Sequence, residues 1–425
     1  MEKLQLSDNI KLLNQGTYGC VFKKGITCDG MVDEENTISK IVEHDITSEN
    51  EINIGKKIMN ISDYSYYFAP ILQTCEIDMT NMESEELNKC KIIQSNKNKK
   101  HLKFQMNKIA YIGDKNILSY LLAVLENKNK IKDFSIEFFN IFVRLLEGYS
   151  LLHKQEIIHM DVKANNLIIN ERKSPIIIDF GISFDIGELI EAKELDTDKE
   201  TYYEMLNDIF FNPEDKYQYW CFDIFVINYA MNNVLFDTEN RRINDMPVNI
   251  DDLIKCADIY FGSNNGIIHL LEENEKQSMK ENYLTYLKEI SNYDKQTETN
   301  NTMWMHVIGK LLENAKTWDI YGLIITYLEI FNILKIKEQK DKVEYLQTFY
   351  KLLKTYMKEI PTKRMSTEEL NKVITTQLQS ITTKERRETT ESLTKVLESP
   401  QHVFDRNQDV QLSVVERSNN IKLKK

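Results

Sequence analysis

The sequence predicts an α+β protein with two lobes, a small β-rich N-terminal lobe followed by a larger, mostly helical lobe. Residues 10–24 and 37–42 alternate apolar and polar side chains, which is typical of strands. After residue 116 the apolar side chains recur at helical spacing instead. The chain has 425 residues, of which 42% are apolar, so it can bury a core large enough to be divided between two lobes.

The elements of the small lobe follow from these patterns. Gly16-Thr17-Tyr18-Gly19 lies within residues 10–24 and predicts a turn that joins two strands. Residues 78–100 are dense in Glu and Lys, and we expect an exposed loop there. The other elements expected in this lobe are a strand at 37–42, a helix at 48–59 and a strand at 103–111.

The larger lobe is expected to consist of helices and three short strands. The apolar runs 157–158, 167–169 and 176–178 have the length of short strands, whereas residues 237–301 are polar and predict no definite element. Residues 376–425 are rich in polar and charged side chains and predict a disordered tail. Helices are expected at 117–125, 134–153, 221–232, 318–333, 341–356 and 367–374.

Composition argues against several classes of function. The formal net charge of −12 argues against a nucleic-acid partner, which requires clustered Lys and Arg, and it favours a basic protein or peptide. The six cysteines form no CxxC pair, so we expect buried thiols and neither a zinc site nor a disulfide framework. No export signal is visible, and the longest apolar stretch, 320–334, is too short to cross a bilayer. We therefore expect a soluble intracellular protein.

Two short segments carry the groups that phosphoryl transfer requires. They are residues 159–166 and Asp179-Phe180-Gly181. Asp161 could accept the proton of an attacking hydroxyl, and Lys163 could place a positive charge beside the transferred phosphate. Asn166 and Asp179 offer the hard oxygen ligands that suit Mg²⁺. The spacing of these residues predicts a metal-dependent phosphoryl transferase.

With these two motifs the sequence resembles the eukaryotic-type protein kinase superfamily. The resemblance implies that Lys40 contacts the nucleotide phosphates and that Glu51 on the next helix is its partner, with Glu49 as the competing candidate. It also implies a glycine-bearing loop over the phosphates, in which Asn14 replaces the first glycine. The nucleotide-binding residues implied there are Leu13, Asn14, Gly16, Thr17, Tyr18, Gly19 and Val21.

The resemblance assigns the remaining segments as well. Asp319 matches the buried helix that anchors the family's catalytic loop better than Asp223 does. Arg364 resembles a late arginine that pairs with a glutamate closing the activation segment, and Pro213-Glu214 is the nearest candidate for that glutamate. The implied boundaries are a kinase domain at 8–375, a small lobe at 8–112, a hinge at 106–113, a helical lobe at 113–375 and a large insertion at 233–316.

Met160 departs from the family pattern, because an arginine usually precedes the catalytic aspartate. That arginine commonly binds a phosphate on the activation segment, and methionine cannot. We therefore predict activity without phosphorylation of the nearby hydroxyl residues Thr197, Thr201, Tyr202 and Tyr203.

The resemblance implies an enzyme, a serine/threonine protein kinase. ATP would bind between the lobes with Mg²⁺ on Asn166 and Asp179, and Asp161 would act as base toward a Ser or Thr hydroxyl of a protein substrate. Lys163, two residues after Asp161, has the position seen in Ser/Thr-directed members. The divergent motifs further resemble kinases of nucleocytoplasmic large DNA viruses, which implies the host cytoplasm and allows packaging in the virion.

Two rival functions stay open. A pseudokinase scaffold, which binds nucleotide without transfer, is suggested by Met160 and Asn14, although the four residues expected to act on the phosphates and metal are all present. A small-molecule kinase of related fold is the other rival. Lys163 and Gly181 argue against it, because such enzymes typically lack both features.

Overall fold

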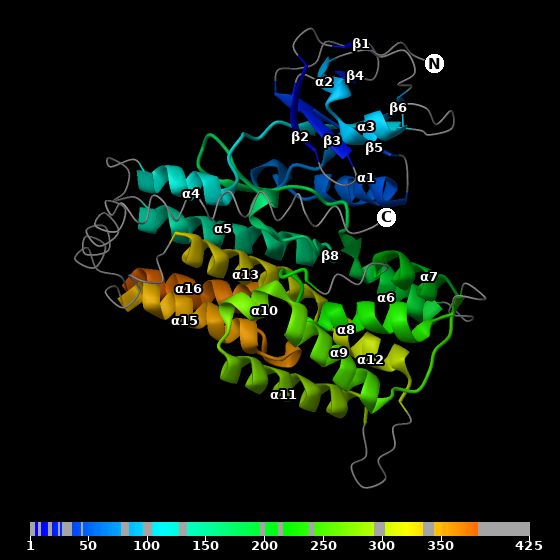
Figure 1. Cartoon of the computed structure of the whole chain (residues 1–425). Coiled ribbons are helices and arrows are strands. Elements are labelled where there is room, and N and C mark those ends of the chain that lie inside the picture. Colours follow the sequence, from blue (N-terminus) through cyan, green and yellow to red (C-terminus); the bar gives the residue numbers. More distant parts are fainter. Residues whose placement is uncertain are drawn as a thin grey trace. The chain divides into compact units, whose positions relative to one another are not determined.

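The described residues of the protein form two compact units. One unit comprises residues up to Tyr120 together with Asn165–Ser183, and the other comprises Leu121–Ala164 and the residues from Phe184 onward. A computed structural model (Figure 1) describes residues 5–6, 10–15, 19–23, 26–27, 36–43, 46–77, 85–96, 104–126, 134–195, 200–210, 216–237, 242–292, 302–334 and 344–380. No helix among these is long and apolar enough to cross a membrane.

The first unit is built on an antiparallel sheet whose five described strands have the order β2-β3-β5-β7-β6. β7 lies between β5 and β6 in this order, and its first four residues are all buried. The strands of the sheet are β2 (Lys11–Gln15), β3 (Gly19–Lys23), β5 (Thr37–Glu43), β6 (Ile71–Ile77) and β7 (Phe104–Ala110). The predicted strands in this region are confirmed, and β6 is an addition to them.

Shorter elements complete the first unit. Helix α1 starts two residues before the predicted helix and ends at the predicted residue. Residues 106–110 of the predicted hinge are strand, because they pair with both β5 and β6, and only residues 111–113 follow the sheet. The shorter elements are β1 (Gln5–Leu6), β4 (Ile26–Thr27), α1 (Ile46–Met59), α2 (Glu85–Asn88), α3 (Lys91–Asn96), β9 (Leu167–Ile169) and β10 (Pro175–Ile177).

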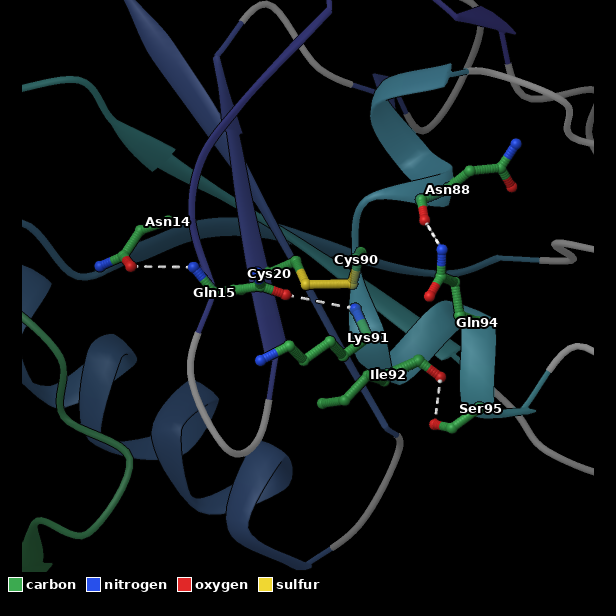
Figure 2. The surroundings of a disulfide bond; sticks show 9 residues. All are labelled: Asn14, Gln15, Cys20, Asn88, Cys90, Lys91, Ile92, Gln94 and Ser95. Carbon is green, nitrogen blue, oxygen red and sulfur yellow. Dashed lines mark hydrogen bonds between the residues drawn. A yellow bond between two sulfur atoms is a disulfide. The ribbon is translucent and has the colours of Figure 1, made fainter. Parts of the chain in front are cut away.

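The loop predicted at 78–100 is wrong for residues 85–96, and the rest of that segment lies outside the described residues. The prediction of buried thiols is confirmed for Cys221 and Cys256 and wrong for three other cysteines. Residues 85–96 form α2 and α3 rather than an exposed loop, and Leu87 and Ile93 are buried in one core with β3 and β5. Cys90 lies in this core and forms a disulfide with Cys20 on β3, 70 residues away (Figure 2). Cys75 is disulfide-bonded as well. Cysteine spacing alone missed these bonds, because a pairing between distant segments has no short sequence signature.

The second unit is helical and has α13 at its core. Every residue of α13 from Trp318 to Leu328 is buried, which explains why apolar residues predominate there; the polar exceptions are Asp319 and Thr326. Its elements before residue 231 are α5 (Phe134–Lys154), β8 (Ile157–Ile158), β11 (Phe184–Asp185), α6 (Ile186–Leu195), α7 (Glu200–Ile209) and α8 (Phe222–Ala230). Helix α4 (Ile117–Glu126) begins in the first unit and ends in the second.

The polar region for which the sequence predicted no element is mostly helical. Helix α11 begins with a capping box formed by Glu272 and Glu275, and α9 begins with Asn249, whose side chain accepts a hydrogen bond from the Asp251 amide. The elements from residue 236 onward are β12 (Phe236–Asp237), β13 (Arg242–Ile243), α9 (Ile250–Ser263), α10 (Asn265–Leu270), α11 (Glu273–Ile290), α12 (Trp304–Leu312), α13 (Trp318–Ile333), α15 (Glu344–Lys358) and α16 (Thr367–Ser380). An α+β fold with a β-rich and a helical part is thereby confirmed.

Candidate active site

Three charged side chains meet in the first unit. Lys40 on β5 donates to both carboxylate oxygens of Glu51 on α1 and to Asp179, each at 2.9 Å. Burial by itself would lower the pKa of Lys40, but the carboxylates of Asp179 and Glu51 outweigh it and raise this pKa above its ordinary value. Lys40 is therefore held as a cation, and its helix partner is Glu51 rather than Glu49.

The glycine-bearing segment enters the sheet beside Lys40. Val21 on β3 pairs with Lys40 on β5, and Gly19 pairs with Val42. A Cβ atom on Gly19 would lie 2.5 Å from the Ile41 carbonyl oxygen, so only glycine fits the backbone there. Leu13 and Asn14 lie on β2, whereas the predicted Gly16, Thr17 and Tyr18 lie outside the described residues.

Asn166 and Asp179 lie on two adjacent segments of the first unit. The Asn166 carbonyl accepts the amide hydrogen of Ile178 at 3.0 Å, which joins the segment before β9 to the segment after β10. Asp179 has a φ of 67°, an uncommon conformation for a residue with a side chain. The Asp179 side chain is 42% exposed, whereas Asn166 is buried. These oxygen donors fit Mg²⁺, which is bound through few protein ligands together with substrate phosphates.

The catalytic-loop residues Asp161 and Lys163 lie in the second unit. Lys163 donates to Asp161 Oδ2 at 2.8 Å, and Tyr217 donates to Asp161 Oδ1. The residue before Asp161, Met160, also has a φ of 67°. Both predicted motifs thus contain a strained backbone position, a feature that clusters at functional sites.

Asp319 holds the catalytic loop in this conformation, as predicted. One carboxylate oxygen accepts the amide hydrogen of His159 at 2.9 Å and contacts His153 Nε2 at 3.0 Å, and the other accepts the amide hydrogen of Met160 at 3.0 Å. All four residues are buried. The carboxylate at the start of α13 therefore satisfies two buried amides that no strand or helix would pair. His159 serves as structural support, since its Nδ1 accepts the Asp161 amide hydrogen at 3.2 Å.

Arg364 pairs with Asp223, a partner that the sequence did not suggest. Two guanidinium nitrogens of Arg364 contact the two oxygens of Asp223 at 2.9 and 3.0 Å, and Trp318 Nε1 donates to Asp223 at 3.1 Å. The alternative partner, Pro213-Glu214, lies outside the described residues. In the sequence, Asp223 at the start of α8 resembles only a weaker candidate for the anchor of the catalytic loop.

Sequence reasoning missed Tyr217 and Trp220. Trp220 Nε1 donates to the Met160 carbonyl at 2.8 Å, so the segment around Tyr217 is bonded directly to the catalytic loop. The available signal was the unusual density of aromatic residues between 209 and 228. It did not identify an individual residue, because aromatic side chains are also the common filling of a core.

Comparisons with known proteins agree with this geometry. The family model for the protein kinase domain matches residues 9–376. The serine/threonine-protein kinase CAK1 of Saccharomyces cerevisiae is 28% identical over 134 residues, which are 30% of this chain and 35% of that protein. A probable cyclin-dependent serine/threonine-protein kinase of Dictyostelium discoideum is 47% identical over 67 residues, 16% of this chain and 5% of its own. The dual specificity protein kinase zak2 of the same organism is 31% identical over 74 residues, 17% and 12% of the two chains. The matches therefore span about a third or less of each relative.

Proposed function

Because this chain belongs to the protein kinase domain family, we propose that it transfers the γ-phosphate of ATP to Ser and Thr hydroxyls of protein substrates in the presence of Mg²⁺. The observation that carries the proposal is the Lys40 network. One lysine bonds both the helix carboxylate Glu51 and the metal-ligand candidate Asp179. The two carboxylates position the Lys40 ammonium for the nucleotide phosphates. A small lobe that is competent for catalysis requires such a cation.

Each residue then has a specific role. Lys40 binds the α- and β-phosphates, and Asn166 and Asp179 hold the metal, which when bound neutralises charge on the phosphates. Asp161 accepts the proton of the acceptor hydroxyl, and Lys163, already bonded to Asp161 at 2.8 Å, places a positive charge beside the transferred phosphoryl group. A carboxylate, an ammonium and two oxygen ligands suffice, because phosphoryl transfer depends mainly on positioning and charge.

Specificity for Ser and Thr and the viral relationship are the finer parts of the proposal. Lys163 supports the first, as does the name of the yeast relative. The helix that anchors the catalytic loop contains Asp319 and lies late in the chain, well after Asp223. This displaced anchor helix supports a relationship with kinases of nucleocytoplasmic large DNA viruses. The relationship implies action in the host cytoplasm. Nuclear accumulation of the tagged full chain in infected cells would argue against that location.

The experiment is radiolabel transfer from ATP to generic basic and acidic proteins by wild type, Asp161→Asn and Lys40→Met. We expect transfer by the wild type and a loss of about a hundredfold or more in each variant, since each removes a charge that acts on the reacting groups. Lys310→Met is the matched control, because Lys310 forms a surface pair with Glu313 at 2.8 Å and should behave as wild type.

Three outcomes would contradict the proposal. Equal labelling by all variants refutes the assigned roles. Binding of ATP without any transfer by wild type supports a scaffold instead. Hydrolysis of the labelled substrate followed by separation of phosphoamino acids tests the acceptor, and phosphotyrosine as the main product would overturn the Ser/Thr assignment.

A further inference from the structure

The carboxylate of Asp161 has a hydrogen bond on each oxygen. Lys163 Nζ donates to Oδ2 at 2.8 Å, and the phenol of Tyr217 donates to Oδ1. An acceptor hydroxyl must donate its hydrogen to this same carboxylate for the base to take the proton. We propose that Tyr217 is an internal competitor whose hydroxyl occupies the place of the acceptor hydroxyl on Asp161. The inference rests on the proposed function and extends it to how the acceptor enters.

The backbone that carries Tyr217 is fixed from several sides. Its carbonyl accepts a hydrogen bond from Asn264 Nδ2 at 3.0 Å. Three residues on, Trp220 donates to the Met160 carbonyl at 2.8 Å and accepts from the Tyr260 hydroxyl at 2.9 Å. The segment is thus tied both to the catalytic loop and to α9 and its end. Displacement of the phenol from Asp161 therefore requires rotation of the Tyr217 side chain and not movement of the segment.

The surroundings of the Tyr217 side chain are compatible with that rotation. Its ring lies between exposed and buried, at edge-to-face distances of 5.3 Å from Tyr219 and 5.1 Å from Trp220. The ring is therefore supported at the surface and is not locked in a core. A hydrogen bond to a charged group is stronger than a neutral one, so the phenol holds the carboxylate until a better-placed donor arrives.

The competitor role and a supporting role predict opposite effects. If the phenol competes with the acceptor, its removal tightens acceptor binding and leaves the rate at saturating acceptor unchanged. If instead the phenol positions Asp161 for catalysis, its removal lowers kcat. The nucleotide is not a competitor for Asp161, so the KM for ATP is unaffected in the first case. The split between the acceptor KM, the ATP KM and kcat therefore decides between the two.

The test is a steady-state analysis of Tyr217→Phe, which keeps the ring against Trp220 and removes only the hydroxyl. We expect the acceptor KM to fall about tenfold, the effect of losing one hydrogen bond to a charged group, with kcat and the ATP KM within about twofold of wild type. Tyr219→Phe is the matched control from the same segment, because its hydroxyl donates to Glu329 at 2.7 Å and not to Asp161. Its acceptor KM should stay at the wild-type value.

An unchanged or raised acceptor KM in Tyr217→Phe, or a lower kcat, would overturn the competitor role. An equal fall in KM in Tyr219→Phe would do the same, because the effect would then belong to the whole segment. Asp161→Asn is assayed alongside. Loss of transfer in that variant establishes the proposed reaction independently, so a negative result for Tyr217 leaves the function standing. Full transfer by Asp161→Asn refutes the role of Asp161 as the base, and with it the premise of the competitor role.

Discussion

Two ionic networks, one in each unit, use the same chemistry in opposite surroundings. Lys40 is 16% exposed and its partner Asp179 is 42% exposed, whereas Arg364 and Asp223 are both completely buried. A pair that reaches solvent can exchange a protein partner for a ligand at modest cost. A fully buried pair cannot exchange a partner in this way, because either charge left alone inside the protein is strongly unfavourable. This difference is consistent with the proposed role of the first network in nucleotide and metal binding, and it predicts that the second network stabilises the helical unit.

Arg364→Leu should produce the largest effect on stability. Among the described residues it leaves Asp223, which is charged and buried, with Trp318 as its side-chain donor, and we expect a loss of about 3–5 kcal/mol in the free energy of unfolding. Denaturant unfolding followed by tryptophan fluorescence measures the loss. Lys310→Met, which breaks an exposed pair, should cost less than about 0.5 kcal/mol. Similar losses of stability in both variants would show that burial does not determine how much an ion pair contributes to stability.

Removal of the Cys20–Cys90 disulfide tests whether this covalent bond stabilises the first unit, as the buried Arg364–Asp223 pair is expected to stabilise the second. The bond (Figure 2) closes a loop of 70 residues. One of its cysteines, Cys20, directly follows Gly19 of the glycine-bearing segment. Cys20→Ala/Cys90→Ala should lower stability by about 2–4 kcal/mol, mainly because the unfolded chain gains freedom. Thermal unfolding under non-reducing conditions provides the measurement. An unchanged melting temperature would contradict this role.

Glu51→Gln should reduce activity without a comparable change in stability. The neutral amide of the variant lacks the charge that, with Asp179, holds Lys40, and we expect phosphoryl transfer to fall on the order of a hundredfold. Label transfer and thermal unfolding are measured on the same sample. Glu49→Gln is the control, since Lys40 bonds Glu51 and not Glu49. A large loss of stability with little loss of activity would reverse the assignment of the first network.

Glu275 offers an intermediate case at the surface of the second unit. Burial would raise the pKa of Glu275, but Lys354, the Glu272 amide and Lys358 lower it to about 2. A lowered carboxyl pKa stabilises the fold above the ordinary value of 4.5, and this contribution is lost as the pH falls from 4.5 toward 2.

Glu275→Gln should therefore cost about 1 kcal/mol at pH 7, a value limited by solvent screening, and progressively less below pH 4.5. Unfolding curves for wild type and variant across this pH range test the sign. Glu281→Gln is the comparison at each pH, because the exposed Glu281 carboxylate accepts a hydrogen bond from the neutral Gln277 amide at 2.7 Å. A difference between wild type and Glu275→Gln that grows with acidity would contradict the lowered pKa.

The smallest effect is expected at the hydroxyl residues of α7 and the segment before it. Met160 is buried and its amide and carbonyl are bonded to Asp319 and Trp220, so protein groups hold the loop where a phosphate-binding arginine would otherwise act. Thr201→Ala, Tyr203→Phe and, beyond the described residues, Thr197→Ala should each keep activity within about twofold. Tyr202→Phe belongs to the same series, although Tyr202 is buried. A large loss of activity in any one variant would show that phosphorylation is required.

The sequence predicted elements best where the pattern is local and regular. α13 begins and ends at the predicted residues, and β5, β7 and α5 lie within a residue or two of their predicted bounds. β6 was missed because its interior residues are mostly exposed, so it lacks the alternation that marks a half-buried strand. Helix α11 was missed because its four buried residues, Met279, Tyr283, Tyr286 and Leu287, stand among many charged and polar residues, which gives a weak periodic pattern.

The sequence by itself located the candidate residues for phosphoryl transfer, because Asp161, Lys163, Asn166 and Asp179 lie in two short motifs. It also identified Asp319 through the apolar helix that surrounds it. Only the tertiary structure decided the pairings of Arg364 with Asp223, of Cys20 with Cys90 and of Tyr217 with Asp161. Each joins segments that are 56 or more residues apart. Folding brings such partners together through packing that no local pattern records.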